Sequence, residues 1–223
     1  MLYLHETLDV IYGKADEYAA AVEKLFLPIA KRRDLRPVGF WNTVSVTGRW
    51  PEVIAFWEID DWSAFARQRE THHERDRMTP GLTEYLSKAS QWRSGGFDRM
   101  LVPAEGCRTL KELVAGNVKG KVFLHETIEC KPANVSRYME TTIDGWPIAR
   151  RLGLEPIGAY QSAFRDFEVL NIWALKDWQA WATFQESQSG DPKFQAWTAK
   201  LSALRTRWEA KLLTPVSWCP LAG

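Results

Sequence analysis

The tetrapeptide Leu-His-Glu-Thr occurs twice in the chain, once from Leu4 and once from Leu124, each time inside an apolar run. Side chains alternate between the two faces of a strand, so Glu6 shares its face with Leu4 and Leu8. A carboxylate in such surroundings needs a partner, or its pKa rises and it can exchange a proton near neutral pH. We therefore predict that Glu6 and Glu126 are catalytic acids or bases, with a structural role, paired to an Arg or to backbone amides, as the alternative.

The histidines of the two tetrapeptides point to the opposite face of their strands. His5 and His125 could meet across the centre of the fold, either as catalytic residues or as neutral core residues. A second pair, His72 and His73, lies in THHERDRMTP, which is longer than its counterpart SQSGDP later in the chain. If this loop folds inward, one of these two histidines can form an acid/base pair with Glu6; otherwise both are solvated.

Aromatic and amide residues of the apolar segments in the middle of each half are candidates for the wall of a substrate-binding pocket. They are Trp41, Asn42, Trp57, Tyr160, Gln161, Asn171 and Trp173. Aromatic walls with an occasional amide suit a small hydrophobic or aromatic molecule. Core packing is the alternative for Trp57 and Trp173. The chain contains 12 Trp, which favours an aromatic-rich core or an aromatic-lined cavity.

Composition narrows the range of partners. Lys and Arg together number 29 against 28 Asp and Glu, with no dominant basic run, so nucleic acid is not an expected partner. No apolar segment reaches the roughly 18 residues of a membrane span, and the N-terminus is too short and too acidic for a signal peptide, so we expect a cytoplasmic protein with no membrane partner. Cys107, Cys130 and Cys219 lack metal-ligand spacing, and no phosphate-binding loop occurs. We expect neither a metal nor a cofactor.

The two tetrapeptides belong to a long internal repeat. The segment RPVGFWNT matches EPIGAYQS, and EVIAFWEIDDWSAF matches EVLNIWALKDWQAW, in the same order along the chain. Between the two copies, AEGCRTLKELVAGNVKGK is rich in Gly and charged residues, as is typical of a connector, and has room for one short helix. We predict a first repeat over residues 1–103, a connector over 104–121 and a second repeat over 122–223.

Each repeat is predicted to form a strand, a helix, two strands, a second helix and a last strand. The first helix is expected from Lys14 to Arg33, and its counterpart is expected to begin at Asn134 as N-cap. Pro28 and Pro147 interrupt these helices at equivalent places and predict a kink or a restart. The last strands are expected in RMLVP and LLTPVSW.

Cap residues mark the later helices. Asp61 and Asp177 are expected N-caps, and Thr79-Pro80 and Asp191-Pro192 each combine a cap residue with Pro at the first helical position. In the second repeat the last helix is predicted to carry a buried apolar stripe. Its members are Phe194, Trp197, Leu201, Leu204 and Trp208.

This order of elements is the split βαβ, ferredoxin-like pattern. Both helices cover one side of a four-stranded antiparallel sheet, so the other side is apolar and uncovered, and two such units gain by packing sheet against sheet. The predicted fold class is α+β, with two tandem ferredoxin-like βαββαβ repeats packed as one fused α+β barrel. A homodimer of the fused chain is a further expectation.

The chain resembles the NIPSNAP family of the dimeric α+β barrel superfamily. The resemblance rests on YGKADEY, GFW and VIAFWEIDDW, and on the Pro followed by basic residues in LPIAKRR and WPIARR. It implies the barrel scaffold but no single reaction, because the superfamily includes monooxygenases, lyases, isomerases, heme enzymes and binding proteins. Glu6 and Glu126 stand where the family tends to have Arg. Heme-binding relatives supply an axial His from the second helix, and here Thr83–Leu86 and Gln195–Thr198 contain none.

Three functions follow as alternatives. The first is a cofactor-free lyase or isomerase that moves a proton on a small hydrophobic or aromatic molecule, with Glu6 or Glu126 as acid or base and a His assisting. The second is a cofactor-independent monooxygenase, whose pocket activates an electron-rich substrate toward oxygen. The third is a non-catalytic binding or scaffold protein, which would have both glutamates in salt bridges and no cavity for a ligand.

Overall fold

The computed structural model describes residues 1–73 and 79–223, and for residues 71–73 the backbone only. The first half contains β1 (Leu2–Val10), α1 (Ala15–Ala21), η1 (Val22–Phe26), α2 (Leu27–Arg32), β2 (Arg36–Thr43), β3 (Glu52–Ile59), α3 (Trp62–His73), α4 (Leu82–Ala89) and β4 (Arg93–Pro103). The connecting segment contains α5 (Leu110–Ala115). The second half contains β5 (Val122–Cys130), η3 (Pro132–Asn134), α6 (Val135–Asp144), α7 (Trp146–Arg151), β6 (Glu155–Ser162), β7 (Glu168–Leu175), α8 (Trp178–Ser187), η4 (Gln188–Gly190), α9 (Pro192–Leu204) and β8 (Arg205–Pro215).

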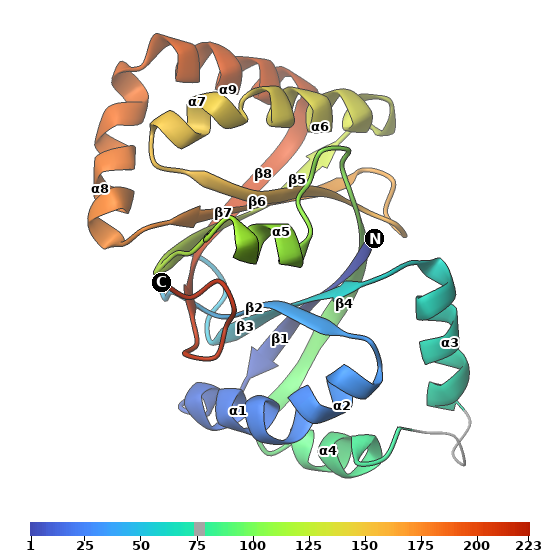
Figure 1. Cartoon of the computed structure of the whole chain (residues 1–223). Helices are drawn as coiled ribbons and strands as arrows, with labels where there is room; N and C mark the ends of the chain where they lie inside the picture. The colour runs from blue at the N-terminus through green and yellow to red at the C-terminus, as the bar shows by residue number, and fades with distance from the viewer. Residues whose placement is uncertain (74–78) are drawn as a thin grey trace.

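The strands form one closed barrel in the order β1-β3-β2-β8-β5-β7-β6-β4. Within each half the strands pair antiparallel, and the halves join where β2 pairs with β8 and β4 pairs with β6. The helices of the two halves lie on opposite outer sides, so the sheets meet in the middle of the molecule (Figure 1). The predicted fused α+β barrel is confirmed. Because the barrel is closed, none of these strands has an unpaired edge. Open sheets must protect such edges against pairing with other chains.

Three hydrophobic clusters follow from the alternation of side chains along the strands. One lies between the first sheet and its helices, one lies between the second sheet and its helices, and the third fills the barrel. In β1, Leu8 belongs to the first cluster, whereas Tyr3 belongs to the barrel cluster. In β5, Leu124 faces the helices and Phe123 faces the barrel. The division of the tetrapeptide strands into two faces is therefore as predicted.

The first helix of each half is interrupted at its proline. In the first half a π-helical turn separates α1 from α2, and Pro28 lies in the first turn of α2, where its missing N–H leaves no bond unmade. In the second half Pro147 lies in the first turn of α7, after α6 has ended. A restart occurs in the second half, where Gly145 separates α6 from α7, whereas in the first half the helical backbone is continuous and departs from regular α-helix through the π-helical turn. Asn134 is not a side-chain cap, since its amide donates to the Leu204 carbonyl at 3.3 Å.

Of the four cap residues predicted for the later helices, three are confirmed. The Oδ1 atoms of Asp61, Asp177 and Asp191 each accept a hydrogen bond of 2.8 Å from the backbone N–H three residues later. The Thr79-Pro80 prediction is wrong, because α4 begins at Leu82 after Gly81, whose φ of 85° is readily adopted only by glycine.

The last helix of the second half is shorter than its apolar stripe predicts. The backbone becomes extended at Arg205, where β8 begins, so the stripe ends at Leu204. Trp208 therefore belongs to β8 and not to a helix. Its spacing of four from Leu204 agreed with a helical period only by coincidence. The last strands begin well before the predicted RMLVP and LLTPVSW segments, at Arg93 and Arg205.

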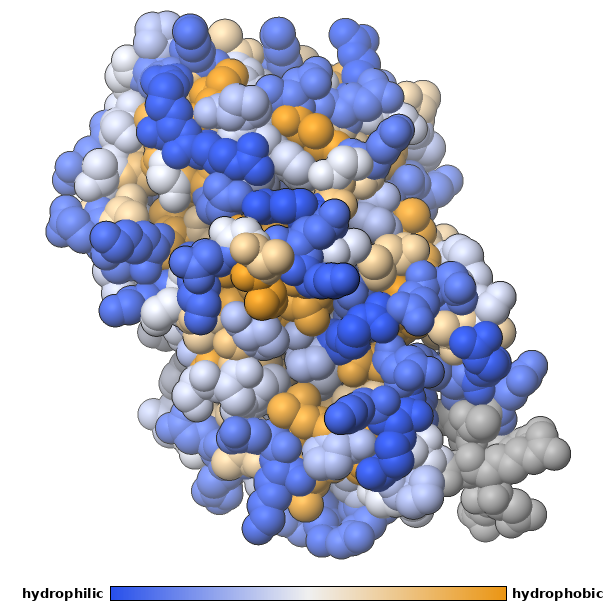
Figure 2. All heavy atoms as spheres, viewed as in Figure 1, coloured by the Kyte–Doolittle hydropathy of each residue, from blue (hydrophilic) through white to orange (hydrophobic). Residues whose placement is uncertain are grey.

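On the face shown in Figure 2, hydrophilic residues predominate and hydrophobic side chains form small separate groups. In the described parts of the chain, no helix is long and apolar enough to cross a membrane.

Candidate functional site

Each half of the molecule has a cavity between its sheet and its helices. The cavity of the first half, which we call the Glu6 cavity, has a volume of about 360 Å³ and is lined by residues of β1, β3, β4 and the first-half helices. The cavity of the second half, the Glu126 cavity, has a volume of about 570 Å³ and is lined by residues of β5, β7, β8 and the second-half helices. Both volumes lie in the range of small-molecule sites. The predicted carboxylates thus border two related cavities.

Glu6 projects from the middle of β1 into an apolar environment. Its Oε2 accepts a hydrogen bond of 2.6 Å from the indole N–H of Trp57 on β3. The pKa of Glu6 is raised to about 7, mainly by burial and also by the nearby Asp98 charge, whereas the Trp57 hydrogen bond and the charges of Arg93 and Arg69 oppose the rise. A carboxyl group with this pKa can both accept and release a proton at neutral pH, as general acid/base chemistry requires.

Asp98 is the second carboxylate of the Glu6 cavity. It stands directly opposite Glu6 in the pairing of β1 with β4. Its own pKa is raised, mainly by partial desolvation, while Arg93 and Arg69 lower it. The equivalent residue opposite Glu126 in the second half is Ala210. The pair of carboxylates is therefore a feature of the first half alone.

Two tyrosines supply further proton donors to the Glu6 cavity. Tyr18 and Tyr85 line it, and the Tyr85 hydroxyl donates to the Tyr18 hydroxyl at 3.4 Å. Burial raises the pKa of both phenols, so both stay protonated at neutral pH. A protonated phenol can donate a hydrogen bond to a substrate oxygen that becomes negative during a reaction.

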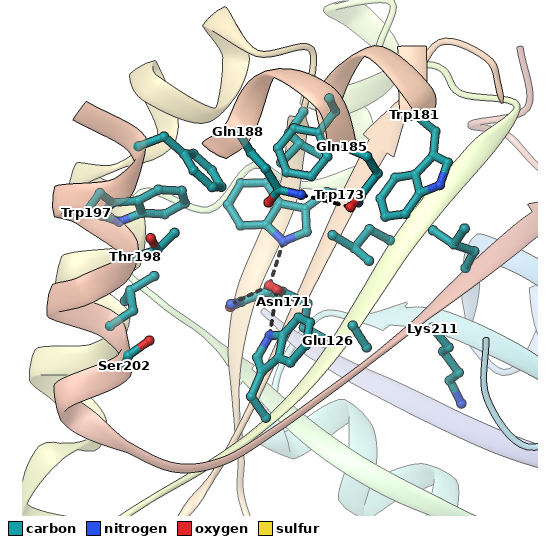
Figure 3. Close-up of a pocket in the computed structure, with 18 of the residues that line it drawn as sticks. Glu126, Asn171, Trp173, Trp181, Gln185, Gln188, Trp197, Thr198, Ser202 and Lys211 are labelled. Carbon is teal, nitrogen blue, oxygen red and sulfur yellow. Dashed lines mark hydrogen bonds between the residues drawn. The ribbon is translucent and has the colours of Figure 1, made fainter. Parts of the chain in front are cut away.

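Glu126 is bound by more groups than Glu6. Its Oε2 accepts from Trp173 Nε1 at 2.8 Å and from Asn171 Nδ2 at 3.1 Å, and its Oε1 accepts from Trp208 Nε1 at 2.8 Å. Figure 3 shows Trp173 and Asn171 converging on the carboxylate from the sheet. The positions matching Asn171 and Trp208 hold Ala55 and Gly96 in the first half, as the strand registers show. The repeated motif therefore produces two chemically different sites.

The histidines of the tetrapeptides meet inside the barrel. His5 Nε2 and His125 Nε2 lie 2.8 Å apart, so one ring donates the proton that the other accepts. Burial, with the charges of Arg99 and Lys211, holds the pKa of both rings well below the usual value, and both are neutral. The predicted meeting of the two rings is thus confirmed, and neither ring lines the Glu6 or the Glu126 cavity; a catalytic role for the pair stays a prediction.

A polar hollow of about 520 Å³ opens at one end of the barrel and includes His125 in its lining. Of its cationic residues, Arg49 pairs with Asp9 of the same half, whereas Arg99 and Lys211 have acidic partners from the other half. Arg99 forms a buried ion pair with Glu168 at 2.7 Å, and Lys211 forms one with Glu52. These pairs link β4 to β7 and β8 to β3, so they connect the two halves of the molecule.

His72 and His73 end helix α3, so they are not in a loop as predicted. Their side chains lie outside the described residues, and the prediction that one of them reaches the Glu6 cavity stays a prediction.

The predicted wall residues divide between the two faces of the sheets. Trp57 lines the Glu6 cavity, and Asn171 and Trp173 line the Glu126 cavity. Trp41 and Tyr160 are fully buried in the barrel cluster instead, because alternation directs them to the same side as His5 and His125. Asn42 and Gln161 follow them in β2 and β6 and line neither of the two cavities.

Sequence reasoning missed Asp98, Arg93 and Trp208. All three lie in the early parts of β4 and β8, which the predicted last strands excluded. A signal was available in the alternation of Trp208, Ala210 and Leu212, which share one face of a strand. Across the described residues, no group of three or more His, Cys, Asp or Glu side chains is placed to hold a metal ion.

No model of a known protein family matches the chain, and no curated protein sequence matches it. Solved structures do. A protein from Lactobacillus acidophilus NCFM described as a "putative monooxygenase" superimposes with a TM-score of 0.65 and 10% identity, over 96% of this chain and 93% of that one. An anthrone oxidase-like protein superimposes with a TM-score of 0.61 and 9% identity, over 96% of this chain and 91% of that one.

A NIPSNAP domain protein from Burkholderia xenovorans aligns with 49% of this chain and 100% of its own length, at 26% identity and a TM-score of 0.42. The two proteins that superimpose over nearly the whole chain show its fold. The molecule thus has the architecture of the dimeric α+β barrels, with both halves of the barrel carried by one polypeptide.

Proposed function

We propose that the protein is a cofactor-free enzyme, a lyase or an isomerase, that moves a proton on a small hydrophobic or aromatic molecule bound in the Glu6 cavity. One observation carries this proposal: Glu6 lies in a mostly apolar cavity of about 360 Å³, accepts an indole hydrogen bond from Trp57, and has its pKa raised to about 7. Carboxyl groups tuned in this way serve as general acids or bases near neutral pH.

The chemistry is a proton transfer through Glu6. In the ionised form its carboxylate removes a proton from a carbon atom of the substrate, and the electron pair of the broken C–H bond moves into the substrate. The hydroxyls of Tyr18 and Tyr85 and the charge of Arg93 are available to stabilise the resulting anion. In an isomerase, Glu6 returns the proton to another atom; in a lyase, the electron pair expels a leaving group, which can take up that proton.

A purely structural role for the two glutamates fits the contacts less well. Such a role predicts that Glu6 and Glu126 are neutralised by salt bridges and that no cavity lies beside them. Among the residues that the structure describes, the hydrogen-bond donors to both carboxylates are neutral indole and amide groups. Both carboxylates also line cavities.

A cofactor-independent monooxygenase is the second candidate. The names of two proteins with the same fold, a "putative monooxygenase" and an anthrone oxidase-like protein, favour it. The same base would serve: removal of a proton from an anthrone gives an electron-rich anion that reacts with oxygen directly. The overall change is anthrone plus O₂ to anthraquinone plus water, in which the ring carbon is oxidised and O₂ is reduced.

A simple carbon acid tests the proposed base without knowledge of the natural substrate. In 5-nitrobenzisoxazole, removal of the ring C–H proton breaks the N–O bond and releases a coloured cyanophenolate. We expect the purified protein to accelerate this ring opening, with a rate that rises with pH around 7 as Glu6 ionises. Glu6→Gln should reduce the protein-catalysed rate at least tenfold, and the matched Glu126→Gln variant should retain it.

Two outcomes decide between the candidates. Equal rates for folded Glu6→Gln and wild-type protein would remove Glu6 from the mechanism. Oxygen uptake with anthrone as substrate, lost in Glu6→Gln, would favour the monooxygenase over the lyase or isomerase.

A further inference from the structure

The carboxylate of the Glu126 cavity has no cationic partner within the described residues. All three groups that donate to it are neutral: the indoles of Trp173 and Trp208 and the amide of Asn171. A carboxylate held by neutral donors in a mostly apolar cavity keeps its attraction for a cation, because the surroundings do not screen it as water does.

The two cationic side chains at the cavity are occupied elsewhere. Lys211 forms its ion pair with Glu52, and its amino group points away from Glu126 in Figure 3. Arg205 donates to Ser202 at 3.1 Å, and its guanidinium lies over the ring of Trp208, 5.2 Å from the centroid. A cationic ligand would therefore complete the site.

Indole rings surround this carboxylate. The cavity is lined by Trp173, Trp181, Trp197 and Trp208, together with Phe184 and Phe194. Aromatic faces attract cations, Trp most strongly, and the attraction grows when water is excluded. In Figure 3, Trp181 lies on one side of the cavity and Trp197 on the other, with Trp173 between them. This combination of aromatic walls and one acid suits an organic ammonium ion.

The remaining polar groups of the wall are neutral. Gln185 and Gln188 come from α8 and η4, and Thr198 and Ser202 come from α9 (Figure 3). They offer hydrogen bonds to a polar group at the far end of a ligand without competing for its charge. The volume of about 570 Å³ leaves room for a ligand larger than a bare ammonium group.

The Glu6 cavity lacks this character. Arg33, Arg69 and Arg93 line it together with Glu6 and Asp98, so its acidic groups already have cationic side chains beside them. No Trp stands at the position of Trp208, where the first half has Gly96. The two copies of the motif therefore differ in the groups around their carboxylates: arginines and a second acid surround Glu6, whereas indole and amide groups bind Glu126.

We propose that the Glu126 cavity is a separate binding site for an organic ammonium ion, with Glu126 as its counter-ion and the indole rings as its walls. This site is distinct from the proposed proton transfer at Glu6 and does not depend on it. A ligand of this class would bind without being chemically changed.

Two probes of the same shape and different charge test the proposal. Choline carries a quaternary ammonium group, and 3,3-dimethylbutan-1-ol replaces that nitrogen with carbon. We expect choline to quench tryptophan fluorescence with a Kd at least tenfold lower than that of the alcohol. Glu126→Gln should remove this preference, whereas the matched Glu6→Gln variant in the other half should keep it.

A second variant tests the same site if Glu126→Gln does not fold. Trp181 is a partly exposed wall residue that makes no bond to Glu126, and Trp181→Leu should weaken choline binding severalfold, measured by calorimetry, with an unchanged circular dichroism spectrum. Equal affinity for choline and the alcohol in the wild-type protein would overturn the proposal. So would an equal loss of choline binding in Glu6→Gln and Glu126→Gln.

Discussion

At the scale of single residues, the neighbours of a glutamate decide what it can do. Glu6 and Glu126 occupy the same place in the same repeated strand, and each accepts a bond from the Trp of the strand beside it. Among the described residues, three hydrogen bonds hold Glu126, whereas Glu6 accepts one and faces the carboxylate of Asp98. The tetrapeptide predicted where both acids lie, but not this difference, which comes from cross-strand partners far away in the sequence.

The charges around Glu6 should move its pKa in opposite directions. Asp98 raises this pKa, so Asp98→Ala should lower it and move the rising limb of the pH–rate profile with 5-nitrobenzisoxazole to lower pH, by about half a unit to one unit. Arg93 lowers the same pKa, so Arg93→Met should move the limb to higher pH. Shifts of the same sign in the two variants would contradict this electrostatic account.

At the scale of elements, the sequence predicted the order of strands and helices because hydrophobic periodicity and cap residues are local signals. It failed where a boundary depends on tertiary pairing. The start of β8 at Arg205 is set by its pairing with β5, and no Gly or Pro marks it. Trp208 was therefore assigned to a helix, and its bond to Glu126 could not be foreseen. Trp41 and Tyr160 are predicted at a cavity but lie in the barrel, because β2 and β6 are buried on both faces in their middle and polarity does not alternate there.

Close packing of an aromatic ring over a glycine is repeated in β2 and β6. A Cβ atom built on Gly158 would lie 2.3 Å from the Tyr160 hydroxyl, and one on Gly39 would lie 1.8 Å from the Trp41 ring. Gly158→Ala should therefore displace Tyr160 and lower the free energy of unfolding by about 1–3 kcal/mol, as overpacking does. Gly190→Ala, which meets no atom within 4 Å, is the control and should change it by less than about 0.5 kcal/mol. Equal urea midpoints for the two variants would refute the packing argument.

At the scale of the whole molecule, the barrel joins its halves around a polar centre. The neutral His5–His125 pair is flanked by the ion pairs of Arg99 with Glu168 and of Lys211 with Glu52. Burial of charged groups is tolerated here because each has a partner from the other half. A positive charge on the histidine pair would have no such partner among the described residues.

Acid should therefore weaken the molecule through this pair. Unfolded histidines take up protons below about pH 6.5, whereas the buried pair resists protonation. The unfolded state then binds more protons, and the free energy of unfolding falls as pH decreases below 6.5, by up to about 1.4 kcal/mol per pH unit for each histidine. Urea unfolding at pH 6.5 and 5 should show a smaller loss in the His5→Gln/His125→Gln double variant. An identical loss in both proteins would contradict this assignment.

Glu6 contributes with the opposite sign. Its pKa is raised from 4.5 to about 7, so the folded state holds a proton that the unfolded state releases between these values, and stability falls as pH rises through this range. Glu6→Gln removes this penalty and should stabilise the protein at pH 8 by up to about 3 kcal/mol. The contribution of Glu6 is common to the wild type and the histidine double variant, so their comparison cancels it.

The proposed proton transfer requires that the Glu6 carboxyl titrates near neutral pH inside its cavity. Carbon-13 NMR of protein labelled at the glutamate carboxyl carbon, with Glu6→Gln to assign the signal, measures this directly. The account predicts that the signal missing from Glu6→Gln titrates with a pKa of about 7. Titration of that signal near 4.5, the usual value for a solvated glutamate, would contradict it.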